Sequence, residues 1–166
     1  MIDHIEKGYG LKARIEALGY ILQSVDGVWL SSDDEAVQAI IDGYTVADAI
    51  AHRQAEVEVL SKALHDRAVA AVSKGEIGAW PIKLMEMRAY AAGGDPADAT
   101  ILGPEAVNRG VTLAELCEKV SANAQFFAAL EAAISGVSGR HRDTLAQLST
   151  FEDVLAYDVA SGWPEV

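Results

Sequence analysis

The feature that most constrains this chain is a long seven-residue periodicity in its C-terminal third. One position of the repeat carries Leu113, Val120, Phe127, Ile134, His141 and Leu148. The other carries Leu116, Asn123, Leu130, Val137, Thr144 and Phe151. Nine of these twelve positions are apolar, which predicts a long helix packed against another long element. A capping box of Thr112 and Glu115 should begin this helix, and Gly136 and Gly139 predict a bend or a close backbone approach within it.

A second long helix is expected over residues 46–74. Thr45 and Asp48 form another capping box, and no glycine or proline follows before Gly75 and Gly78, which should end the helix. Its apolar residues alternate at spacings of four and three, which predicts an apolar seam along one face of the helix, but arginines occupy two positions of this seam. It could pair with the 113–148 helix of the same chain as an antiparallel hairpin, or the seam could pair with a second copy of the chain.

The first 44 residues predict a small α+β unit. Leu11, Ile15 and Leu18 have helical spacing, and Gly19 suits the end of that helix. An Asp-Gly pair between β-prone segments predicts a two-stranded hairpin at 20–31. A helix over 34–43 should follow, with a capping box of Ser32 and Glu35 and an inner face of Ala36, Val37, Ile40 and Ile41.

The remaining segments are shorter. Pro81 suits the first position of a helix whose inner face would be Ile82, Met85 and Ala89. Gly93-Gly94-Asp95-Pro96 predicts a hinge. Ser149-Thr150, followed by Glu152-Asp153, should cap a last helix over 151–159. We therefore expect a mainly α chain, with the α+β unit followed by long helices packed as a helical hairpin or coiled-coil-like bundle. The expected divisions are 1–44, 45–92, 93–111 and 112–166.

Composition excludes several classes of protein. The 166 residues include 25 acidic and 13 basic side chains, for a net charge of −12, which disfavours nucleic-acid binding. A single cysteine, Cys117, cannot form an intramolecular disulfide and is expected to be a buried apolar residue. No apolar stretch reaches the roughly 20 residues of a membrane span, and the start does not resemble a signal peptide. The composition favours a soluble protein of a reducing compartment rather than a secreted or membrane protein.

No catalytic, cofactor or metal site is predicted. The four histidines have no metal-ligand spacing, and the glycines do not form a phosphate-binding motif. The nearest constellation is Arg140-His141-Arg142-Asp143, which we interpret as a polar position in the helix seam or a surface charge cluster rather than an acid–base site. We therefore expect a protein that is not an enzyme.

The candidate partner-binding residues are mainly aromatic. Three tryptophans lie near breaks in the predicted elements, where such residues either lock a junction or anchor a partner. The stretch after Arg142 also has no basic residue. The candidates are Trp163, Tyr157, Asp153, Asp158, Trp80 and Trp29.

Three segments carry a resemblance to a known group of proteins. They are Asp34-Glu35-Ala36-Val37-Gln38-Ala39-Ile40-Ile41-Asp42, Met87-Arg88-Ala89-Tyr90-Ala91-Ala92-Gly93-Gly94, and the 113–148 helix with Thr150-Phe151-Glu152-Asp153 and Gly162-Trp163-Pro164. In these the chain resembles small, acidic, helix-rich tail-fibre assembly proteins of tailed bacteriophages and prophages. The resemblance implies an assembly chaperone that helps a fibre subunit fold and trimerise, or a minor virion component retained at the tail.

A second hypothesis comes from the charge alone. A small protein with a net charge of −12 could mimic DNA or occupy a basic groove of a host protein, and so act as a phage-encoded inhibitor.

Overall fold

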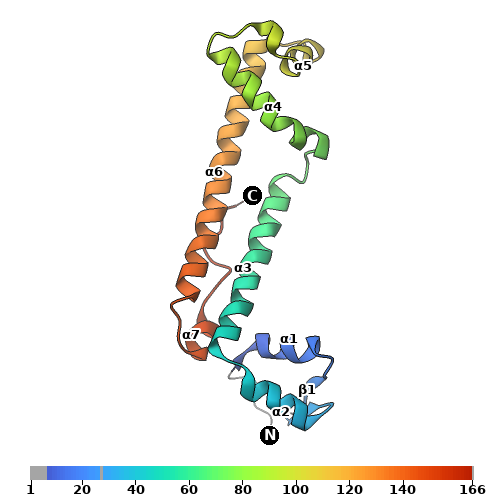
Figure 1. Cartoon of the computed structure of the whole chain (residues 1–166), viewed down its shortest axis with the longest axis vertical. Coiled ribbons are helices and arrows are strands. Elements are labelled where there is room, and N and C mark those ends of the chain that lie inside the picture. Colours follow the sequence, from blue (N-terminus) through green and yellow to red (C-terminus); the bar gives the residue numbers. More distant parts are fainter. Residues whose placement is uncertain (1–6, 27, 166) are drawn as a thin grey trace. The chain divides into compact units, whose positions relative to one another are not determined.

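The computed structural model describes residues 7–26 and 28–165, and it is mainly helical with one small β-hairpin (Figure 1). The chain divides into two compact units. The first comprises Met1–Ala63 and Ser135–Trp163, and the second comprises Leu64–Ile134 and Pro164–Val166. Two long helices, α3 (Val46–Ala68) and α6 (Leu113–Leu145), contribute residues to both units.

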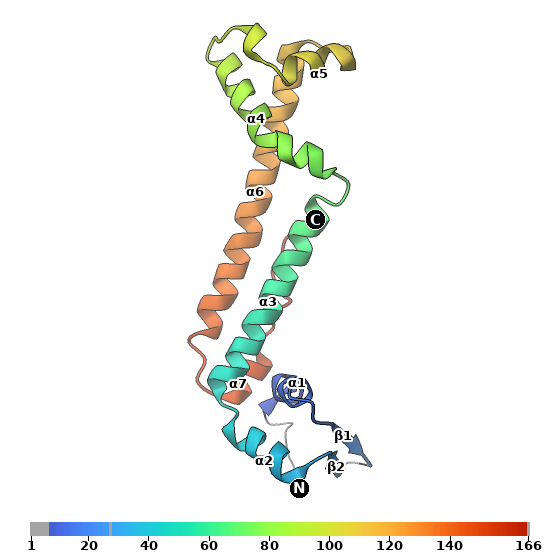
Figure 2. The ribbon, with the colours of Figure 1, turned by 45° about the vertical axis from the view of Figure 1, so that its right-hand side comes forward.

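The first unit begins with the predicted helix, hairpin and helix. These are α1 (Tyr9–Ala17), antiparallel strands β1 (Leu22–Val25) and β2 (Val28–Ser31), and α2 (Asp34–Gly43). The hairpin register pairs Val25 with Val28, so the turn lies at the predicted Asp-Gly pair, of which Gly27 lies outside the described residues. Figure 2 shows both strands close to α1 and α2, as a two-stranded sheet requires for stability.

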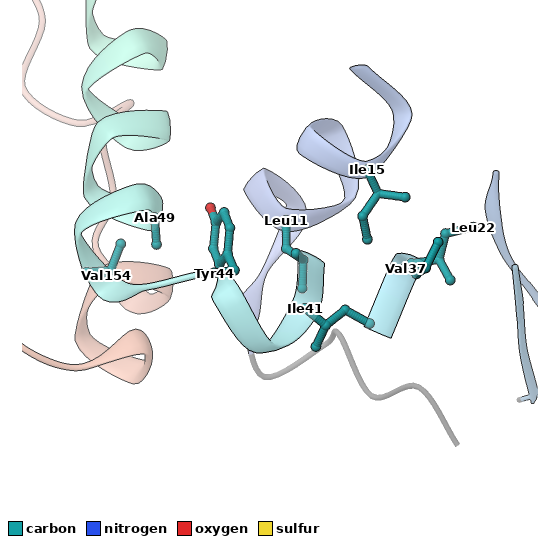
Figure 3. Close-up of a cluster of buried hydrophobic side chains, with 8 residues drawn as sticks. All are labelled: Leu11, Ile15, Leu22, Val37, Ile41, Tyr44, Ala49 and Val154. Carbon is teal, nitrogen blue, oxygen red and sulfur yellow. The ribbon is translucent and has the colours of Figure 1, made fainter. Parts of the chain in front are cut away.

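The core of this unit joins residues that are far apart in the sequence. Leu11 and Ile15 of α1 and Val37 and Ile41 of α2 are buried against one another (Figure 3). The cluster is completed by Leu22 of β1, Tyr44, Ala49 of α3 and Val154 of α7 (Phe151–Ala156). The inner faces predicted for both short helices are therefore confirmed, except that Leu18 is exposed.

A second cluster in the same unit pairs the two long helices within one chain. Val57 of α3 and Leu145 of α6 are completely buried together, and Val159 from the C-terminal segment joins them. His141 takes its predicted seam position and is buried. The sequence left open whether the seam pairs within or between chains, and these contacts are within the chain.

Three of the four predicted capping boxes are confirmed. The backbone N–H of Asp48 donates to Thr45 Oγ1 at 3.3 Å, and equivalent bonds join Glu115 to Thr112 and Asp153 to Thr150. The box of Ser32 and Glu35 is wrong. Asp33 caps α2 by accepting from Ala36 N, because Ser32 Oγ instead accepts from Ile21 N beside the hairpin.

The second unit contains α4 (Lys74–Ala91), a 3-10 turn η2 (Pro96–Asp98), α5 (Leu102–Arg109) and most of α6. Its core is formed by Ala99, Leu102, Ala106, Leu116 and Cys117. Gly110 ends α5 with a left-handed φ of 65°, which glycine adopts without steric cost.

The bounds of α3 and α4 differ from the prediction. The helix expected over 46–74 ends at Ala68, a turn follows, and Ser73 caps α4 by accepting from Glu76 N at 3.1 Å. Gly75, Gly78 and Pro81 therefore lie inside α4 instead of marking a break. In Figure 2 α4 changes direction along its length, as expected for a helix with an internal proline.

The glycines of α6 also behave differently from the prediction. The helix continues without a break through Gly136 and Gly139 and ends at Leu145, before the predicted Leu148. A Cβ placed on either glycine meets no described atom within 4 Å beyond the helix's own nearby backbone, so no close approach requires a glycine there. The last helix ends at Ala156 rather than residue 159.

Candidate functional site

A large cleft lies within the second unit, among α4, α5 and α6. Its volume is about 740 Å³, which falls in the range typical of ligand-binding pockets. Apolar side chains form most of its walls: Ile77, Trp80, Pro81, Leu84, Leu116, Val120, Ala124 and Phe127. Its polar residues are Glu76, Lys83, Glu105, Arg109, Lys119 and Asn123.

The aromatic wall of the cleft joins two helices. The ring of Trp80 in α4 lies against Phe127 in α6, with centroids 4.7 Å apart. Phe127 also makes an edge contact with Phe126, whose side chain is 63% exposed. An apolar wall that continues into an exposed aromatic is typical of a binding surface for another apolar group.

A buried lysine forms the polar part of the cleft. The side chain of Lys83 is only 8% exposed, and its Nζ lies 2.7 Å from carboxylate oxygens of both Glu76 and Glu105. Glu105 also accepts a hydrogen bond from Arg109 at 2.8 Å. This chain of ion pairs ties α4 to α5 and compensates the cost of burying the ammonium group.

The protonation state of Lys83 follows from these partners. Burial alone would lower its pKa, but the hydrogen bonds and charges of Glu105 and Glu76 outweigh that effect and raise the pKa above its ordinary value. Lys83 is therefore a cation at neutral pH. The pair with Lys83 in turn lowers the pKa of Glu105, so this carboxyl group is ionised.

A second buried charge, Glu86, fixes the start of α5. Its carboxylate accepts hydrogen bonds from Thr100 Oγ1, Ile101 N and Leu102 N at 2.9 to 3.1 Å. Ile101 occupies the N-cap of α5 and offers no capping side chain, so a residue from another helix performs that role. The result is a fixed orientation of α5 relative to α4 at the cleft.

Cys117 lies in the core of this unit and has no reactive character. It is 7% exposed, and burial together with the charge of Glu86 raises the pKa of its thiol. The predicted role as a buried apolar residue is therefore confirmed. Among residues 7–26 and 28–165, no group of three or more His, Cys, Asp or Glu side chains could hold a metal ion. In the same residues, no helix is long and apolar enough to cross a membrane.

Comparisons with protein-family models, with curated proteins and with solved structures found no match.

The structure brings together two of the candidate residues predicted from the sequence, and it does so around His141. Tyr157 Oη lies 2.7 Å from His141 Nδ1, and the Trp163 ring lies 5.4 Å from the His141 ring. Trp163 also donates from Nε1 to Val159 O at 2.9 Å. These contacts tie the C-terminal segment to α6 within the first unit.

The other candidates lie elsewhere. Asp153 lies in the first turn of α7, where its N–H donates to Oγ1 of the N-cap residue Thr150. Asp158 accepts from Ala160 N at 2.9 Å. Trp29 is half-buried in β2 and packs against the core of the first unit. Trp80 is the only one of the six candidates that lines the cleft described above.

Sequence reasoning missed the charged residues of α4. The predicted inner face of Ile82, Met85 and Ala89 is wrong because all three are exposed, whereas Lys83 and Glu86 are buried. A signal was present: Glu76, Lys83 and Glu86 are spaced by seven and three residues and so share one face of a helix. The acceptors and donors that make this face the buried one come from α5 and the turn before it.

Proposed function

We propose that this chain is a non-enzymatic accessory protein of a bacteriophage tail that binds a tail-fibre polypeptide in the α4–α5–α6 cleft. It would act in the host cytoplasm as an assembly chaperone for the fibre, or remain in the virion as a minor component. The observation that carries the binding role is the large, mainly apolar cleft whose wall includes the rings of Trp80 and Phe127. The fibre as partner rests on the sequence resemblance.

The charges of the cleft suggest which kind of segment it accepts. The cleft is lined by three basic residues, Lys83, Arg109 and Lys119, and by two acidic residues, Glu76 and Glu105. It therefore has an excess of one positive charge, although the net charge of the chain is −12. A polypeptide segment with aliphatic or aromatic side chains and a nearby carboxylate would complement both the walls and this charge. Such apolar segments are exposed in a fibre subunit before it trimerises, which is when a chaperone is needed.

Co-expression with a tail-fibre gene of the same genome tests this proposal. We expect the fibre to be soluble and trimeric with the wild-type chain and to aggregate with Ala124→Arg, because the arginine would fill the cleft. Ala122→Arg is the matched control, since Ala122 is exposed on the same helix and does not line the cleft. Circular dichroism of both variants establishes that α6 still folds.

Two results would count against the proposal. A fibre that is equally soluble and trimeric without this protein would contradict the chaperone role. A fibre complex that survives Ala124→Arg unchanged would remove the cleft as the binding site. The acidic-inhibitor hypothesis differs, because it expects binding to a basic host protein that neutralisation of exposed acidic residues abolishes and Ala124→Arg leaves intact.

A further inference from the structure

A second, smaller cleft lies in the first unit and is independent of the proposed fibre-binding site. Its volume is about 320 Å³, and it lies where the start of α1 meets α3 and the end of α7. The residues around it are Lys7, Gly8, Tyr9, Gly10, Tyr44, Ala49, His52, Arg53, Glu56, Val154 and Leu155.

The hydroxyl group of Tyr44 is the unusual feature of this cleft. Tyr44 is 3% exposed, and its Oη makes no hydrogen bond within the described part of the chain. Among the buried side-chain nitrogen and oxygen atoms of the described residues, only Ser138 Oγ is likewise without a partner. The ring cannot easily turn away, because it stacks on Phe151 with centroids 6.1 Å apart and packs in the core shown in Figure 3. A buried hydroxyl without a partner costs about 1–3 kcal/mol, so its presence needs an explanation.

The start of α1 faces this hydroxyl group at very short range. A Cβ on Gly10 would lie 2.5 Å from Tyr44 Oη and 2.8 Å from His52 Cγ, so only glycine fits there. The N-cap residue, Gly8, supplies no side-chain hydrogen bond, and the first turn contains no acidic residue. The N–H of Leu11 donates to Gly8 O at 3.2 Å, so the N–H groups of α1 that the helix itself leaves without an acceptor are those of Tyr9 and Gly10. Together with the helix dipole, such groups favour an anion.

The charged side chains around the cleft also favour an anion. Lys7 donates to the carbonyl oxygens of Ile41 and Tyr44 at 2.6 and 3.1 Å, and these acceptors leave its charge uncompensated. Arg53 pairs with Glu56 at 2.6 Å. The cleft therefore carries one excess positive charge before His52 is counted, although the whole chain has a net charge of −12.

Tyr44 acts as a donor in this setting. Burial, with a smaller contribution from the charge of Asp48, raises the pKa of its hydroxyl group, and the opposing effect of Arg14 is smaller. The group is therefore protonated at neutral pH and can donate its hydrogen to an acceptor.

We propose that this cleft binds a small organic anion. Its carboxylate or phosphate oxygens accept hydrogen bonds from Tyr44 Oη and from the first N–H groups of α1. Its organic body lies against Ala49, Val154 and Leu155, which form the apolar part of the lining. The volume exceeds what a single bound water needs and is close to the lower limit for small-molecule pockets, which suits an anion with one ring or a short chain.

Titration of the full chain with four probes tests this inference. The probes are benzoate, phenyl phosphate, inorganic phosphate and, as a cationic control, benzylamine. We expect benzoate or phenyl phosphate to bind in calorimetry and to raise the thermal midpoint with concentration, and benzylamine to do neither. Preference for benzoate assigns a carboxylate ligand, and preference for phenyl phosphate or inorganic phosphate assigns a phosphate.

The variant Tyr44→Phe makes the test specific. It should weaken binding of the preferred anion by about tenfold, which corresponds to 1.4 kcal/mol, because a hydrogen bond to a charged group is lost. The unliganded variant should keep or raise its thermal midpoint, because the hydroxyl group that it removes has no partner in the free protein. Tyr20→Phe is the matched control, since Tyr20 packs against the same core and does not line the cleft.

Three outcomes would overturn the proposal. They are the absence of binding by any of the three anions at millimolar concentration, equal affinity of wild type and Tyr44→Phe, and binding of benzylamine as tight as that of benzoate. A second variant, Gly10→Ala, should abolish binding by placing a methyl group against Tyr44 Oη. Binding that survives this substitution in a folded variant would also contradict the site.

Discussion

At the scale of single residues, the second unit shows how a charged side chain can belong in a core. Glu86 is 6% exposed and replaces the missing N-cap of α5 with a carboxylate from α4. Burial alone would raise its pKa, but the hydrogen bonds from Leu102 N, Thr100 and Ile101 N outweigh that effect and lower the pKa. A carboxylate that is already paired in this way stabilises the fold only while it is ionised.

We therefore predict that Glu86→Gln lowers the free energy of unfolding by about 1–3 kcal/mol at pH 7, because one amide cannot satisfy the same donors. The folded-state pKa is below the unfolded value of about 4.3, so the stabilisation exists above that value and is lost as pH falls through the folded pKa. The difference between wild type and variant should therefore shrink as pH falls below about 4.3. Urea unfolding of both proteins between pH 7 and pH 3 measures this difference in the free energy of unfolding.

Glu118→Gln is the control for this prediction, because Glu118 is exposed on α6. It should change the free energy of unfolding by less than about 0.5 kcal/mol at any of these pH values. A difference between wild type and Glu86→Gln that stays constant down to pH 3 would show that ionisation of Glu86 does not contribute.

At the scale of elements, α4 is the helix in which local rules and tertiary contacts disagree. Pro81 would suit the first position of a helix, but α4 begins seven residues earlier, where Ser73 caps it. A proline in a helix interior removes one backbone hydrogen bond and clashes with the preceding turn. The helix tolerates it where Trp80 packs against Phe127 and Lys83 pairs with two carboxylates.

We predict that Pro81→Ala stabilises the protein by about 1–3 kcal/mol, because it restores the missing donor and removes the clash. Pro104→Ala is the matched control. Pro104 lies in the first turn of α5, where the N–H group has no acceptor within the helix, so its replacement should have little effect. Thermal unfolding followed by circular dichroism compares the two variants, and equal midpoints for both would contradict this account of α4.

At the scale of the whole molecule, the apolar core is divided. Leu11 is completely buried in one of the two clusters of the first unit, and Leu102 is completely buried in the cluster of the second unit. Each unit is assembled from two separate stretches of sequence. One boundary between the units falls within α3 and another falls within α6. Cores that share no buried residue are expected to open as separate cooperative units.

We predict that Leu11→Ala and Leu102→Ala each destabilise the protein by about 2–5 kcal/mol. Hydrogen exchange with mass spectrometry should show where that effect falls. Leu11→Ala should accelerate exchange in α1, α2 and α7, whereas Leu102→Ala should accelerate it in α4 and α5. Acceleration of all five helices to the same extent in both variants would mean that the two cores unfold together.

Local signals explain which parts of the fold were predictable. The hairpin, the two short helices around it and the capping boxes at Thr45, Thr112 and Thr150 depend on residues within about four positions of one another. The end of α3 was not predictable in this way, because the turn after Ala68 contains neither glycine nor proline.

The sequence by itself determined the kind of elements, most of their starts and the seam of α6, because periodicity and capping act over a few residues. The tertiary structure decided which face of α4 is buried and where both clefts lie. Glu86 meets its partners 14 to 16 residues away, and Lys7 meets Ile41 across 34 residues. A buried charge or an unpaired hydroxyl is defined by such distant neighbours, so only the folded chain reveals Lys83 and Tyr44 as the polar centres of their clefts.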